Sequence, residues 1–231
     1  MINTQQTQKE VRLIGVNHID PRGPERLRTQ MEAYKPEVIT LEADQELFFE
    51  MDNVHQNTQK YLRLPNGKEL INILAKETFS SELLKNANPD SVVNFYKAMG
   101  YECWIAAEYA LSHPGTRIKF VDSKELTDTA MGEIGDSALT EIAQYLALPP
   151  QEYQRRIDED YAHEESDVAA TAKISERNIT MAAGIISVGN KRTLHVGGLE
   201  HSFGNSPNMY ELLRKFGTPV SRIKLIDIEK R

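Results

Sequence analysis

The chain has 231 residues, of which 40% are apolar and 26% are charged, a composition typical of folded globular proteins and not of disordered ones. Its formal net charge of -7 argues against nucleic-acid binding, because phosphate contacts need a concentrated basic surface. The first ten residues are polar and no apolar run is long enough to span a bilayer, so we expect no membrane segment and a cytoplasmic location. The single cysteine, Cys103, leaves no disulfide framework and no thiolate metal cluster.

The chain begins with the pattern of a strand, a helix and a second strand. Residues 11–16 are rich in apolar and β-branched side chains, which predicts a buried strand. Gly23-Pro24 then opens a helix that Lys35-Pro36 closes, and residues 37–42 form the second strand. The crossover through a helix makes these two strands parallel.

The rest of the chain continues this alternation with two long helical stretches. Helices are expected from about residue 44 to 111, and a third strand at 117–122. A second helical stretch leads to a helix at about 167–188, a fourth strand at 192–196 that ends in Gly197-Gly198, a helix from Ser206-Pro207, and a last strand at 222–228 on a sheet edge.

These elements predict one α/β domain over residues 1–231. It has a mostly parallel central sheet of about five strands, helices on both faces, and helical insertions at about 44–112 and 123–165. In such sheets ligands bind beyond the carboxyl ends of the strands. The residues expected at that edge are His18, Glu42, Asp122 and His201.

Both of these histidines stand in a Gly-x-x-His pattern after a strand. One pattern runs from Gly15 to His18 and the other from Gly198 to His201. Glycine lets the backbone turn sharply or approach a ligand closely, so that the histidine can point back across the strand end. Two histidines with one or two carboxylates suit a divalent transition metal such as Mn²⁺, Co²⁺ or Zn²⁺ that keeps one position for water. His195 lies inside the fourth strand and is expected to be structural.

The order of the motifs resembles that of the TraB/PrgY pheromone-shutdown family, with its GumN and Tiki relatives. The resemblance rests on six segments in sequence: Gly15 to His18, Lys35 to Glu42, Gly100-Tyr101-Glu102 followed by Ala106 and Ala107, Ile118 to Asp122, Glu176-Arg177-Asn178 with Met181, and Leu194 to His201. Together they cover nearly the whole chain. Two positions depart from the family pattern, since Ser123 replaces a frequent arginine and Asn178 a frequent aspartate.

The resemblance implies a Tiki-like α/β fold, distantly akin to erythromycin-esterase-like and ChaN-like proteins, and the metal-dependent peptide hydrolysis of the Tiki branch. The predicted function is therefore that of a metal-dependent hydrolase acting on a peptide or small molecule. The metal ligands would be His18, His201 and Glu42, and the catalytic residues Glu42, Glu102 and Arg177, supported by Gly15, Asp122 and Gly198. The metal would activate water, a carboxylate would take its proton, and Arg177 would face the developing oxyanion.

Several alternatives stay open at this point. Glu42 and Glu102 could form a structural ion pair with Arg177, and Asp122 could cap the helix that begins near Lys124. A metal-free, esterase-like hydrolase would use one histidine as base with a carboxylate orienting it. Other family members are known chiefly as regulators, so a protein that binds a peptide or small molecule without turnover is a further alternative, and the ChaN-like kinship permits haem or iron binding. The helical insertions leave room for a homodimer.

Overall fold

The structure is a computed structural model, and it describes residues 10–61, 69–73, 81–125, 139–162, 172–204 and 207–230. Predictions for the amino terminus and for the gaps between these ranges, including the start of the helix expected from residue 167, lie outside the described residues. No helix among the described residues combines the length and the apolar character that crossing a membrane requires.

Within the described part of the chain, five parallel strands form the central sheet. They are β1 (Val11–Val16), β2 (Val38–Leu41), β3 (Arg117–Phe120), β4 (Thr193–Gly198) and β5 (Val220–Lys224). Their order across the sheet is β3-β2-β4-β1-β5, and every neighbouring pair is parallel. The predicted α/β class is thereby confirmed, and β5 lies at an edge as expected.

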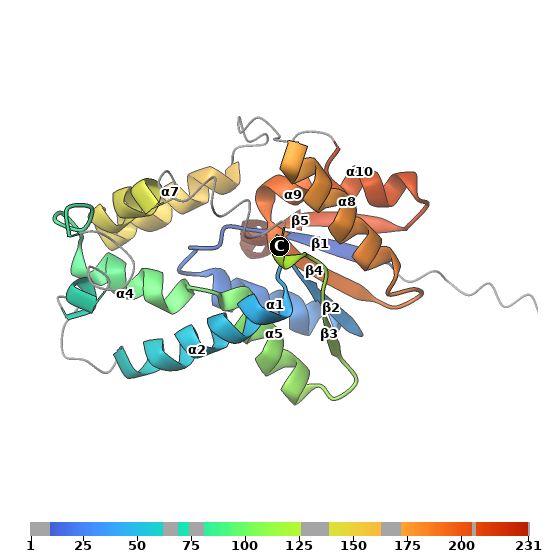
Figure 1. Ribbon diagram of the computed structural model, residues 1–231, viewed down its shortest axis with the longest axis horizontal. Helices are drawn as coiled ribbons and strands as arrows, with labels where there is room; N and C mark the ends of the chain where they lie inside the picture. The colour runs from blue at the N-terminus through green and yellow to red at the C-terminus, as the bar shows by residue number, and fades with distance from the viewer. Residues whose placement is uncertain are drawn as a thin grey trace, which may run out of the picture.

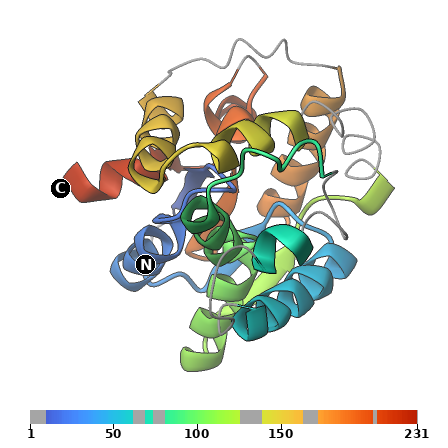
Figure 2. The ribbon, with the colours of Figure 1, turned by 90° about the vertical axis from the view of Figure 1, so that its left-hand side faces the viewer.

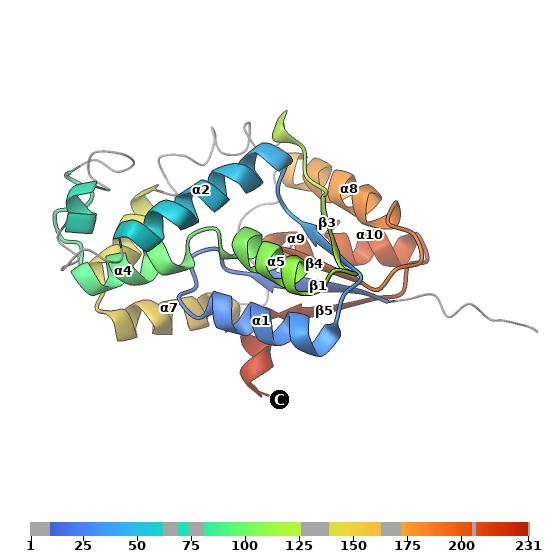
Figure 3. The ribbon, with the colours of Figure 1, turned by 90° about the horizontal axis from the view of Figure 1, so that it is seen from below.

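Helices cover both faces of this sheet, as Figures 1 and 3 show. One face carries α8 (Ala172–Ile186) and α10 (Met209–Lys215), and the other carries α1 (Gly23–Tyr34) and α5 (Tyr101–Ser112). Successive side chains of a strand point to opposite faces. Accordingly, Leu13 of β1 packs with the α8 and α10 cluster, whereas its neighbour Ile14 belongs to the larger core on the other face.

A separate group of helices lies beyond the carboxyl ends of the strands, at the left of Figure 1 and facing the viewer in Figure 2. It contains α2 (Gln45–Tyr61), α4 (Pro89–Ala98), α7 (Pro150–Ala162) and the helical residues 139–147. These helices belong to the two predicted insertions. The carboxyl edge of the sheet therefore faces this group of helices.

The structure differs from the prediction in two places, one directly after β4 and one in β5. A short helix, α9 (Leu199–Phe203), follows β4 directly, whereas the next helix was predicted only from Ser206-Pro207. The last strand begins at Val220 and ends at Lys224, and a 3₁₀ helix, η1 (Leu225–Lys230), takes up the rest of the predicted strand. Apolar side chains at Ile226 and Ile228 pack on the main core from this helix, so their alternation has a cause other than a strand.

Candidate active site

The side chains predicted for the site meet at the carboxyl edge of the sheet and come from six elements or the turns after them. His18 follows β1, Glu42 follows β2 and Asp122 follows β3, while His201 lies on α9 behind β4. Glu102 reaches the same edge from the first turn of α5, and Arg177 reaches it from α8. The contacts between them form two connected groups, one around Glu42 and one between His18 and Glu102.

Glu42 is the centre of the first group. Its Oε1 accepts a hydrogen bond of 2.8 Å from Arg177 Nη2, and its Oε2 accepts one of 2.6 Å from the backbone N–H of Gly198. Arg177 Nη2 also donates to Asp122 Oδ2 at 2.6 Å, so one guanidinium joins two carboxylates. The structural ion pair considered for Glu42 is therefore present, and Asp122 shares it.

His201 is buried against the same carboxylate. Its Nε2 lies 3.0 Å from Glu42 Oε1, and its Nδ1 lies 2.7 Å from Asn178 Oδ1. Although Nε2 is at ion-pair distance from Glu42, it has no hydrogen-bond partner among the described residues. A buried nitrogen beside a carboxylate without a hydrogen bond is unusual, because burial makes an unsatisfied polar atom costly.

The charges of this group reinforce one another. Burial alone would raise the pKa of Glu42, but His201 and then Arg177 outweigh it and hold this pKa well below its ordinary value. Burial alone would lower the pKa of His201, but the Glu42 carboxylate raises it. Glu42 is therefore held ionised and His201 is favoured as a cation.

His18 and Glu102 form the second group. His18 Nδ1 lies 2.7 Å from Glu102 Oε1, in hydrogen-bond geometry, and 53% of the His18 side chain is exposed. The crowding of protein atoms around the ring lowers its pKa, but Glu102, with Glu42 and Glu200 further away, raises it to about 10. Glu102 thus pairs with His18, and not with Arg177 as the structural alternative had it.

Two residues outside the predicted site, Glu200 and His195, lie beside it. Glu200 lies 3.9 Å from His201 Nε2 and raises the pKa of both site histidines. His195, expected to be structural, is fully buried, and its Nε2 has no hydrogen-bond partner among the described residues. A Cβ on Gly197 would lie 2.8 Å from that Nε2 and 2.8 Å from Glu42 Oε2, so His195 borders the Glu42 carboxylate. The sequence indicates this placement only through the spacing: His195 stands two residues before Gly197, and such residues share one face of a strand.

The first Gly-x-x-His glycine has a packing role. A Cβ on Gly15 would lie 3.0 Å from the side chains of Leu199 and Phe203. The absence of a side chain lets α9 lie against β1, and α9 carries His201. Gly15 lies inside β1 and has no positive φ, so it supports the second histidine and does not itself form the turn at His18.

The suitability of this site for a metal can be judged from its donor atoms. Among the described residues, no three His, Cys, Asp or Glu side chains are gathered as metal ligands. The pair of His201 Nε2 and Glu42 Oε1 does fit a cation, because a nitrogen without a hydrogen bond faces a carboxylate oxygen while the other ring nitrogen bonds to an amide oxygen. That pairing of the outer nitrogen is the usual arrangement of a metal-binding histidine.

Comparison of the chain with protein-family models, with curated proteins and with solved structures found no match. The resemblance to the TraB/PrgY family stays a prediction from the motifs. The function must therefore be argued from the site itself.

Proposed function

We propose that the protein is a metal-dependent hydrolase that cleaves an ester or peptide bond at the carboxyl edge of its sheet. The observation that carries this proposal is His201 Nε2, which is buried 3.0 Å from Glu42 Oε1 and has no hydrogen-bond partner among the described residues. A cation held by these two atoms would give Nε2 a partner beside a carboxylate oxygen that already accepts from Arg177. His201 and Glu42 would hold the metal, with His18 as the third protein ligand.

The charge balance supports this assignment. Glu102, Glu42 and Glu200 raise the pKa of His18 to about 10. Glu42 and Glu200 also raise the pKa of His201. A divalent cation carries the same charge as the two protons that these imidazoles would release on binding it, since ligating nitrogens must be deprotonated. We therefore expect metal binding to release protons and to weaken as the pH falls.

Each remaining side chain has a role that follows from its contacts. When bound, a Mn²⁺, Co²⁺ or Zn²⁺ ion supplies a Lewis acid that lowers the pKa of water. Glu102 is hydrogen-bonded to His18, orients that ring and can take a proton. Arg177 is fixed by Glu42 and Asp122 through Nη2 and Nε, which leaves Nη1 to donate to a developing oxyanion.

A metal-free hydrolase is the second candidate, and the His18–Glu102 pair favours it. This pair already has the arrangement of a histidine oriented by a carboxylate, at 2.7 Å, on the exposed side of the site. It needs no metal to transfer a proton. The two candidates differ in one measurable quantity, the metal content of the active protein.

The first experiment is elemental analysis of protein purified without chelators or a metal-binding tag, alongside His18→Ala and His201→Ala variants. We expect near one equivalent of a divalent transition metal in the wild type and a large loss in both variants. A screen of ester and peptide substrates, before and after chelation, then tests the activity. His113→Ala, which changes a half-buried histidine at the far end of α5 from Glu102, is the matched control.

The outcomes separate the candidates. Metal-free protein that stays empty after incubation with Mn²⁺, Co²⁺ or Zn²⁺, yet hydrolyses substrate, contradicts the metal-dependent form and supports the second candidate. Protein that a ligand protects from unfolding, with no product formed, would instead be the binding regulator considered above. The cytoplasmic location, the absence of nucleic-acid partners, the iron or haem alternative and the homodimer stay predictions.

A further inference from the structure

We infer that Asn178 is a positioning residue that fixes the tautomer of His201, with Nδ1 protonated and Nε2 directed at Glu42. The contacts that carry this inference run from the backbone of Pro207 through Asn178 to the imidazole ring. Its value for catalysis rests on the proposed function, but the tautomer itself does not.

The orientation of the Asn178 amide is set at Pro207. Asn178 Nδ2 donates a hydrogen bond of 3.0 Å to the carbonyl oxygen of Pro207. A carbonyl oxygen can only accept, so the amide nitrogen must face it and Oδ1 must face the opposite way. The two ends of an asparagine amide are hard to tell apart by shape, but this contact distinguishes them chemically.

The amide orientation in turn decides the tautomer of the histidine. Asn178 Oδ1 lies 2.7 Å from His201 Nδ1, and an amide oxygen can only accept. Nδ1 must therefore carry a hydrogen in the neutral as well as in the charged ring. In the neutral ring this leaves the lone pair on Nε2, which is 3.0 Å from Glu42 Oε1.

The burial of Asn178 and His201 keeps water from changing the tautomer of the ring. Asn178 is 1% exposed and His201 is 0% exposed, so neither side chain can exchange its partner for bulk water without moving. Asparagine also adds no charge, whereas a carboxylate at this place would add one more to a site that already holds Glu42, Glu200 and Asp122. The lone pair of Nε2 is thus kept for whatever cation lies between the ring and Glu42.

The test is nitrogen-15 NMR of the histidine rings in metal-free protein, at a pH where His201 is neutral. The chemical shifts of the two ring nitrogens report directly which one carries the hydrogen. We expect His201 to show a protonated Nδ1 and a bare Nε2 in the wild type. A protonated Nε2 in the wild type would overturn the inference, whatever the variants do.

Two variants separate positioning from general structural support. Asn178→Leu keeps the branched shape of the side chain but removes the acceptor, so we expect a mixture of tautomers and a fall in metal affinity of about 10–100-fold. Asn178→Asp keeps an acceptor facing Nδ1, so this variant should show the same His201 tautomer as the wild type. An Asn178→Leu protein that is folded, as checked by circular dichroism, and keeps a single Nδ1–H tautomer would contradict the inference.

These measurements also separate the inference from the proposed function. The spectra need neither metal nor substrate. A protein with the expected tautomer that binds no metal and hydrolyses nothing would overturn the proposed function and leave the role of Asn178 on His201 standing.

Discussion

At the scale of single residues, Gly197 is a position where a small change should disturb the site. A Cβ there would lie 2.8 Å from both Glu42 Oε2 and His195 Nε2, which is closer than such atoms approach one another. Neither neighbour can move freely, because Glu42 is held by Arg177 and the Gly198 N–H, and His195 is fully buried. We expect Gly197→Ala to destabilise the fold by about 1–3 kcal/mol through overpacking and to lower metal binding by displacing Glu42.

Chemical denaturation and elemental analysis of the Gly197→Ala protein measure these two effects. Gly115→Ala is the matched control, because nothing lies within 4 Å of a Cβ at Gly115. That control should stay within about 0.5 kcal/mol of the wild type. If Gly197→Ala behaved like the control, Glu42 would have more freedom than its contacts indicate.

The sequence could predict which residues reach the site but not how they pair. His18, Glu42, Asp122 and His201 follow strands, so the rule for parallel sheets placed them at one edge. Pairing depends on side-chain direction across elements far apart in the chain. The partner of Glu102 is His18 from a turn 84 residues away, and no local pattern signals that contact. The same holds for His195, whose approach to Glu42 depends on β2 and β4 lying side by side.

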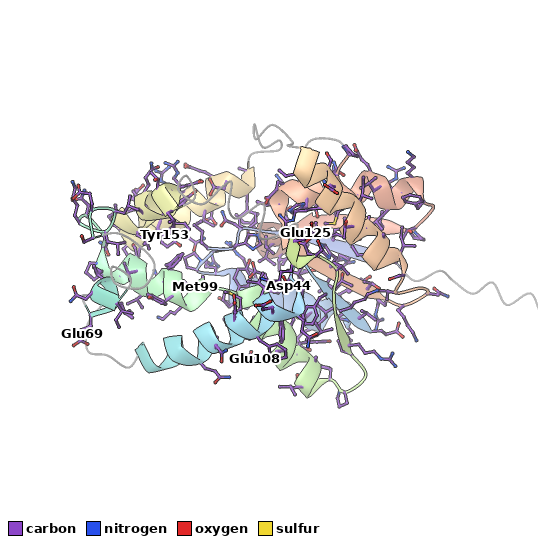
Figure 4. The ribbon with its side chains drawn as sticks, in the orientation of Figure 1. Asp44, Glu69, Met99, Glu108, Glu125 and Tyr153 are labelled. Carbon is purple, nitrogen blue, oxygen red and sulfur yellow. The ribbon has the colours of Figure 1, made fainter. Side chains whose placement is uncertain are left out.

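At the scale of secondary-structure elements, α7 holds the turn that carries His18. The hydroxyl of Tyr153 donates to the backbone oxygen of Ile19 at 2.8 Å, and the hydroxyl of Tyr161 accepts from the backbone N–H of Asn17 at 2.9 Å. Figure 4 labels Tyr153 on this helix. The residues on either side of His18 are thus both bonded to one helix, which fixes the approach of His18 to Glu102.

These hydrogen bonds from α7 to the His18 turn give a second prediction. We expect Tyr153→Phe to cost about 1 kcal/mol of stability, the usual net value of one hydrogen bond, and to loosen the contact between His18 and Glu102. Because Glu102 raises the pKa of His18 to about 10, a looser contact should let that pKa fall toward 6.5. NMR titration of the His18 ring measures it.

Tyr109→Phe serves as the control for this titration. Tyr109 lies near the end of α5 that leads into β3, so it is at the amino ends of the strands, away from His18. That variant should leave the titration of His18 unchanged. An unchanged His18 titration in Tyr153→Phe as well would show that the turn holds its shape without α7.

The elements themselves were predicted well where local signals are strong. The strand at residues 11–16 and the helix from Gly23 to Tyr34 have the expected bounds, since the Gly23-Pro24 start and the Lys35-Pro36 stop are local features. The helix ends where Lys35 takes a left-handed φ of 52°. By contrast, α9 has five residues and no side-chain cap, so it lacks the signals by which a helix is recognised.

At the scale of the whole molecule, the sheet order places the two Gly-x-x-His segments next to each other. Residues Val11–Val16 of β1 pair with Thr193–Gly198 of β4, in a register that sets Gly15 opposite Gly197 and Val16 opposite Gly198. The strands are far apart in the sequence and adjacent in the sheet. Pairing of β1 with β4 therefore brings the His18 turn and α9 to one place, and it also buries His195 in the middle of the sheet.

That burial makes the stability of the whole molecule depend on pH. Burial lowers the pKa of His195 to about 4, against an ordinary value of 6.5. Between these two pH values the unfolded chain binds a proton at His195 that the folded protein does not, so the free energy of unfolding falls as the pH is lowered. The full effect is about 3 kcal/mol, at roughly 1.36 kcal/mol for each pKa unit.

His195→Asn removes this titration and keeps a polar group near Thr40, which contacts His195 Nδ1 at 3.1 Å. In urea titrations from pH 7 to pH 4 the variant should start less stable and lose about 3 kcal/mol less than the wild type. Parallel losses in the two proteins would mean that His195 takes up its proton without unfolding, for which the packing around its ring leaves no room.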